Sequence, residues 1–243
     1  MKGVRGAGLK EGILLALLLY LETACAGGMG EGRSLPVLEK EAHGALVRGE
    51  LTKALRLDRQ ALALSPGDAI LLNNLAVVED RLGEEEKALQ ILEEANRKSP
   101  RDPKILLNLA RIELKIGREG EAFRTAGKIV AMDQWPEGFR TLMGKIDIDL
   151  SRYGEAHIYL HEALERHPGN PLILTYLGIV HYRLGELSDA KNNFREALTR
   201  HPPPRLRGTL EKLMKAPDRV LGPAPSRSFV EEGSPQKKVK GSP

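Results

Sequence analysis

Residues 171–204 read PLILTYLGIVHYRLGELSDAKNNFREALTRHPPP, and this stretch decides how the chain folds. Apolar and small residues recur at helical spacing before Gly185 and again after it, which predicts two amphipathic helices joined by a turn. The residues at which the two helices must touch are small, namely Gly178, Ala190 and Ala197. The same pattern, shifted by multiples of 34 residues, fits four earlier stretches of the chain. The sequence is therefore a repeat array.

The repeats keep one register along the chain. Their ranges are 35–68, 69–102, 103–136, 137–170 and 171–204. The small residues at the helix contacts of the first four repeats are Ala42, Ala54, Ala61, Ala76, Ala88, Ala95, Ala110, Ala122, Gly144, Ala156 and Ala163. A proline closes four of the repeats, at Pro66, Pro100, Pro168 and Pro202. This self-similarity resembles the tetratricopeptide repeat (TPR) family, whose unit is a helix-turn-helix of about 34 residues. The resemblance implies an all-α fold, an α-solenoid of five helix-turn-helix repeats.

The array should end in a C-terminal capping helix over residues 205–216. Apolar residues recur there at i, i+4, i+7 and i+8 and would cover the open face of the fifth repeat. These residues are Leu206, Leu210, Leu213 and Met214. Residues 217–243 are rich in proline, serine and glycine, and they end in a lysine-rich run. Such a composition buries too little apolar surface to fold, so we expect a disordered tail.

Two regions depart from the repeat pattern. Repeat one has Glu41 and Asp58 where apolar groups are usual, which an end repeat can tolerate because one of its faces meets water. At the junction of repeats three and four, larger or polar residues replace the small residue, the closing proline and a large apolar residue. These are Ile129, Gln134 and Arg140. Trp135 either fills the irregular gap together with Phe139 and Met143, or is exposed by a kink as a binding anchor.

The N-terminus predicts export from the cytoplasm. Basic residues precede an unbroken apolar run over residues 13–21, and a small-residue segment follows. Nine apolar residues are too few to span a bilayer, which takes about 20. We therefore assign residues 1–26 to an export signal, either of the lipoprotein or of the secretory kind, and residues 27–34 to a linker.

Cys25 is the single cysteine, so the chain can form no intramolecular disulfide. Thr23-Ala24-Cys25 resembles the end of a bacterial lipobox, in which the cysteine is acylated, although Glu22 stands where that motif has leucine. Ala24-Cys25-Ala26 also fits a signal-peptidase site, which would remove the cysteine. The first reading predicts an outer membrane lipoprotein that faces the periplasm, with a lipid anchor as its membrane contact. The second predicts a soluble periplasmic or secreted protein.

The sequence has no motif for catalysis or for a bound cofactor. It contains no glycine-rich phosphate loop, nucleophile elbow, H-E-x-x-H or paired CxxC motif. His157 and His161 are one helical turn apart, a spacing that can hold a metal ion, but two ligands do not make a site. The other histidines form no constellation with a nucleophile or a carboxylate; they are His43, His167, His181 and His201. We expect no catalytic, cofactor or metal residues.

The resemblance instead implies a partner-binding groove lined by the first helix of each repeat. The side chains expected in it are Asn73, Val77, Arg81, Lys104, Leu107, Arg111, Lys115, Lys145, Ile179, Tyr182 and Arg183. Basic and aliphatic groups alternate there, which suits an extended or helical protein segment with acidic and apolar residues. The 37 basic residues of the whole chain are interspersed with 33 acidic ones, so no nucleic-acid footprint is present.

The predicted function is a non-enzymatic protein-protein interaction scaffold of the bacterial cell envelope. It would serve the assembly or targeting of an envelope complex of the pilus, secretion or motility type. Two alternatives stay open. One is a metal-dependent regulator or small enzyme that uses the His157/His161 surface. The other is a self-associating structural module.

Overall fold

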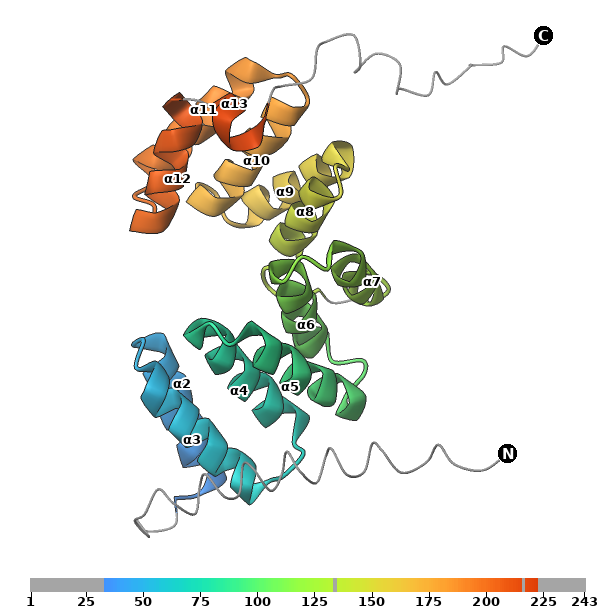
Figure 1. Ribbon diagram of the computed structural model, residues 1–243, viewed down its shortest axis with the longest axis vertical. Helices are drawn as coiled ribbons and strands as arrows, with labels where there is room; N and C mark the ends of the chain where they lie inside the picture. Colours follow the sequence, from blue (N-terminus) through green and yellow to red (C-terminus); the bar gives the residue numbers. More distant parts are fainter. Residues whose placement is uncertain (1–32, 133–134, 216, 223–243) are drawn as a thin grey trace, which may run out of the picture. The chain divides into compact units, whose positions relative to one another are not determined.

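The computed structural model describes residues 33–132, 135–215 and 217–222. These residues form twelve α-helices and no strand, which confirms the predicted all-α fold (Figure 1). They belong to two compact units, Met1–Gly117 and Arg118–Pro243, and each unit is described by itself. The predicted export signal with Cys25, Gln134 and nearly all of the predicted tail lie outside the described residues.

Unit 1 contains five helices in sequential contact (Figure 1). They are α2 (Leu35–Val47), α3 (Leu51–Leu64), α4 (Ala69–Leu82), α5 (Glu85–Lys98) and α6 (Pro103–Lys115). Each helix packs on the next one, and α4 also contacts α6, so that helix pairs stack on one another as a solenoid requires. One continuous cluster of buried leucine, isoleucine, valine and alanine side chains runs through all five helices.

Unit 2 contains the remaining seven helices. They are α7 (Glu119–Val130), α8 (Phe139–Asp149), α9 (Tyr153–Arg166), α10 (Pro171–Arg183), α11 (Leu187–Thr199), α12 (Pro204–Lys215) and α13 (Pro217–Leu221). Helix α12 packs on α11 and buries Leu210 and Leu213 in one cluster with Phe194, as a cap must. The short helix α13 contacts α12 at the start of the stretch that we expected to be unfolded. That expectation was wrong for residues 217–221, because Leu221 packs against the same cluster.

Side-chain caps fix where the first helix of three repeats begins. Asp68, Asp102 and Asn170 each accept hydrogen bonds from two backbone N–H groups of the following first turn, at 2.8–3.4 Å. Helix α8 has no such cap, because its N-cap is Gly138 in the left-handed region. It therefore begins at Phe139, two residues later in the repeat than the other first helices. The irregular junction predicted between repeats three and four lies here.

The turn inside each repeat needs one residue with a positive φ. Glycine supplies it in four repeats, at Gly49, Gly83, Gly117 and Gly185, with φ between 76° and 86°. Repeat four uses Ser151 at φ 58°, a conformation that costs more for a residue with a Cβ.

Two glycines permit the closest helix contacts in unit 2. A Cβ on Gly178 of α10 would lie 2.5 Å from Cδ1 of Phe194 on α11. A Cβ on Gly144 of α8 would lie 2.7 Å from Cδ2 of Leu160 on α9. Both distances are far inside van der Waals contact, so only glycine fits opposite these large side chains.

Replacing Gly178 by alanine should therefore destabilise the chain by about 1–3 kcal/mol, because the added methyl group overpacks against Phe194. The matched control is Gly127→Ala on α7, where a Cβ would meet nothing within 4 Å. That change should stabilise the chain by roughly 0.5–1 kcal/mol, because alanine is the better helix former. Urea denaturation followed by circular dichroism measures both. Equal effects of the two changes would contradict the packing argument.

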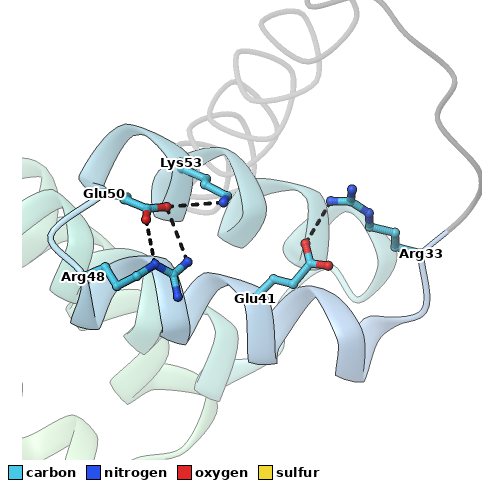
Figure 2. Close-up of polar contacts among 5 residues, drawn as sticks. All are labelled: Arg33, Glu41, Arg48, Glu50 and Lys53. Carbon is cyan, nitrogen blue, oxygen red and sulfur yellow. Dashed lines mark hydrogen bonds and ion pairs between the residues drawn. The ribbon is translucent and has the colours of Figure 1, made fainter.

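Repeat one shows how an end repeat accommodates polar residues. Glu41 occupies a position that is buried and apolar in the other repeats, but its carboxylate is half-exposed and accepts a hydrogen bond from Arg33 at 2.9 Å (Figure 2). Figure 2 also shows Glu50 paired with Arg48 and Lys53 at the turn between α2 and α3. These pairs are exposed, so each contributes little to stability.

Asp58 on α3 is different, because it is only 4% exposed. Burial, reinforced by the charge of Glu39, raises the pKa of its carboxyl from 3.8 to about 7. The equivalent residues Leu92, Leu160 and Phe194 are apolar. We had explained Asp58 by exposure to water at the end of the array, and that explanation was wrong for this residue.

Asp58 should make the stability of the chain depend on pH. Between about pH 4 and about pH 7 the carboxyl of Asp58 is protonated in the folded chain and ionised in the unfolded chain. The free energy of unfolding therefore decreases as the pH rises through this range. Asp58→Leu should therefore stabilise the chain more at about pH 8 than at about pH 4. Urea midpoints at both pH values test this. The exposed Glu93→Gln of α5 is the control and should shift the midpoints equally. A pH-independent gain from Asp58→Leu would refute the argument.

Candidate functional site

The predicted groove residues of unit 1 lie on two first helices that contact each other, α4 and α6. Asn73, Val77 and Arg81 are on α4, and Lys104, Leu107, Arg111 and Lys115 are on α6. We call these seven residues the α4/α6 surface. Their spacing of three and four residues places the members on one side of each helix.

Three members of the α4/α6 surface are held by intramolecular contacts. Lys115 forms ion pairs with Asp80 at 2.7 Å and with Glu85 at 2.8 Å, and these carboxylates raise the pKa of the ammonium group. Arg81 donates to the backbone oxygen of Leu46 at 3.2 Å. The side-chain oxygen of Asn73 accepts a hydrogen bond from Asn108 at 2.8 Å. These groups tie neighbouring repeats together and are less available to a partner than the sequence suggested.

The other two cations of this surface form no ion pair among the described residues, although the charge of Asp80 acts on Arg111. Within the part of the chain that the structure describes, neither Lys104 nor Arg111 forms an ion pair, and both are exposed. Desolvation by surrounding protein lowers the pKa of Arg111, and the charge of Asp80 opposes this shift only in part. Leu107, between them on α6, is 6% exposed, and Val77 is half-buried. The surface therefore presents two cations beside half-buried Val77, while Leu107 is largely buried beneath them.

The predicted groove residues of unit 2 have different environments. Lys145 forms an ion pair with Asp149 on its own helix, α8. Arg183 is half-buried, and Ile179 packs against the cluster beneath α12. Tyr182 is only 2% exposed, and its hydroxyl donates to the backbone oxygen of Gly222 at 2.9 Å. Tyr182 is thus a core residue beneath the C-terminal cap, and we no longer count it as a binding residue.

Trp135 lies in the segment between α7 and α8, where it packs into the irregular gap. Its ring packs edge-on against buried Phe139, with 5.1 Å between ring centroids. The guanidinium of Arg140 lies 4.7 Å from the Trp135 ring centre and pairs with Glu162 at 2.8 Å. This explains why an arginine replaces the usual apolar residue. Half-buried Trp135 also borders a cavity of about 450 Å³, together with Arg140, Arg166 and His167.

The histidine pair of α9 lies beside a third histidine, His181 of α10. The rings of His157 and His161 are 5.9 Å apart, and His161 faces Glu165 at 3.4 Å. His157 packs edge-on against His181 of α10, at 5.3 Å between ring centroids. His181 in turn contacts the carboxylate of Glu186 at 2.5 Å. The expectation that His181 meets no carboxylate was wrong.

The signal for this contact was present in the sequence. Residues five apart across the turn of a repeat are held together by a backbone hydrogen bond, here from Glu186 N–H to the oxygen of His181 at 2.8 Å. Asp147 and Arg152 occupy the same two positions in repeat four and are also paired, at 3.3 Å. Burial raises the pKa of Asp147 to about 6, and Arg152 offsets part of this shift.

No helix among the described residues is both long and apolar enough to cross a membrane.

Comparisons with known proteins agree with the repeat architecture. A family model described as tetratricopeptide repeat matches residues 39–103 and 141–203, together more than half of the chain. A search among curated proteins found no relative of similar sequence.

Three solved structures show the same fold at low sequence identity. PilF of Pseudomonas aeruginosa has a TM-score of 0.63 at 19% identity, covering 77% of this chain and 86% of its own. PilW, described as a widely conserved type IV pilus biogenesis factor, has a TM-score of 0.66 at 18% identity, covering 83% and 92%. TTC0263, described as a thermophilic TPR protein in Thermus thermophilus, has a TM-score of 0.62 at 20% identity, covering 75% and 100%.

Proposed function

Because the chain belongs to the tetratricopeptide repeat family, we propose that it is a non-enzymatic scaffold that binds a segment of a partner protein. The α4/α6 surface is the proposed binding site. Fold alone does not define a function, so the proposal depends on the chemistry of this surface.

The observation that carries the proposal is the pair of cations on α6 that form no ion pair among the described residues. Lys104, Leu107 and Arg111 follow one another at spacings of three and four residues and so share one side of the helix. A carboxylate of the partner would pair with the guanidinium of Arg111, whose pKa is lowered because the surrounding protein desolvates it. An ion pair formed there is stronger than one in open solvent, because the local dielectric is lower. Aliphatic side chains of the partner would contact half-buried Val77, whereas Leu107 is buried and offers little surface.

The partner segment should therefore carry acidic and apolar residues, in an extended or helical conformation. The cations would favour a negatively charged segment and fix its alignment along α6. Burial of apolar groups would supply most of the affinity.

We further propose that this scaffold works in the bacterial cell envelope, attached to the outer membrane through acylated Cys25, as an assembly or targeting factor. The export signal over residues 1–26 supports this location. PilW shares the fold and is described as a pilus biogenesis factor, which supports a role in assembly. The likeness itself is one of fold.

Reversing the charge of Arg111 should weaken binding without unfolding the chain. Peptides selected from a phage-displayed random library against the full chain should be enriched in acidic and aliphatic residues. Arg111→Glu should weaken them by about tenfold or more, because a like-charge contact costs more than about 1.4 kcal/mol. Arg56→Glu, an exposed cation on the second helix α3, is the matched control and should bind as the unaltered chain does. Selected peptides that bind Arg111→Glu undiminished would refute the site.

The membrane attachment has its own test. We expect the chain, expressed in a Gram-negative host, to appear in the membrane fraction with a diacylglyceryl-modified Cys25 as its first residue. Intact mass spectrometry identifies this form, and Cys25→Ser should abolish it. An unmodified soluble chain that starts after the cysteine would refute the lipid anchor but leave export standing. A chain that still carries Met1 would refute export.

A further inference from the structure

The last repeat brings together side chains that can bind a metal ion. His181 near the end of α10, Glu186 at the N-cap of α11 and Asp189 in the first turn of α11 each offer one ligand atom. These three atoms lie within 4.8 Å of one another. We propose that His181, Glu186 and Asp189 form a binding site for a divalent first-row transition metal such as Zn²⁺.

The backbone of the α10–α11 turn holds the three donors in place. Glu186 N–H donates to the oxygen of His181, and Gly185 N–H donates to the oxygen of Tyr182 at 3.1 Å. Asp189 follows Glu186 by three residues, so both carboxylates leave α11 on the same side. Binding a zinc ion at about 2.0–2.2 Å from each donor would bring the ligand atoms closer together than 4.8 Å. Glu186 and Asp189 are exposed, so rotation of their side chains can supply this movement.

The charges at this turn favour a cation. Two carboxylates lie beside one imidazole, and no lysine or arginine among the described residues pairs with either of them. A mixed set of one nitrogen and two oxygen donors suits a first-row divalent ion better than a soft ion, which prefers sulfur. Three protein ligands leave at least one coordination position for water or for a ligand from a partner.

His157 supports the site from the neighbouring helix. Its ring packs edge-on against the ring of His181 and restricts its rotation. His161 belongs to a different contact, because it faces Glu165. The proposed site therefore differs from the His157/His161 pair that the sequence suggested.

Calorimetric titration of the untagged full chain with ZnCl₂, after treatment with a chelator, tests the site. The Cys25→Ser background is needed because a free thiol also binds zinc. We expect one equivalent of Zn²⁺ to bind, and Glu186→Gln or Asp189→Asn to lower the affinity at least about tenfold. Both residues are exposed, so neither change should affect folding, which circular dichroism verifies.

Two controls separate this site from other zinc ligands. His161→Gln removes the other histidine of the α9 pair, and His43→Gln removes an exposed histidine of unit 1. Both should leave the affinity unchanged. Zinc binding that persists in the Glu186→Gln/Asp189→Asn double variant, or that is lost in His161→Gln, would overturn the proposal. Absence of any binding to the unaltered chain would overturn it as well.

Discussion

Close contact between the two helices of a repeat is the constraint on which the rest of the structure depends. Alanine or glycine occupies the contact positions except at Ile129, and in unit 1 Ala76, Ala88 and Ala95 are fully buried. Small side chains let the helix axes approach, and the larger residues around them then interlock, as Leu92 does in α5 and Phe194 in α11. The backbone geometry of the turn follows from the same requirement, since a short connection must return the second helix against the first.

Sequence periodicity predicted the helices well because this contact recurs at a fixed spacing. The side-chain caps at Asp68, Asp102 and Asn170 coincide with the expected repeat starts. The sequence predicted that the repeat pattern is irregular before α8, but it did not predict the conformation there, because that depends on how Trp135 and Arg140 pack against each other. Likewise, the pKa of Asp58 depends on its burial and on the nearby charge of Glu39, which a pattern of residue types does not measure.

The binding surface was harder to predict, because a repeat template gives the direction of a side chain and not its partner. Lys115 and Arg81 point as expected but are committed to Asp80, Glu85 and a backbone oxygen. Tyr182 follows the template too, yet residues at the C-terminal end cover it. Arg111 differs from Lys115 and Arg81 because, within the described part of the chain, it forms neither an ion pair nor a hydrogen bond to a backbone oxygen, which the repeat pattern does not show.

Glu41 and its partner Arg33 limit how copies of the chain can meet. A solenoid whose first and last repeats were both apolar could stack head to tail into an open-ended filament, because the same interface would repeat without closing. A further repeat packed against this part of α2 would have to take an exposed ion pair out of water. Helix α12 meanwhile covers the apolar side of α11. Both features disfavour polymerisation of the chain through the ends of the array.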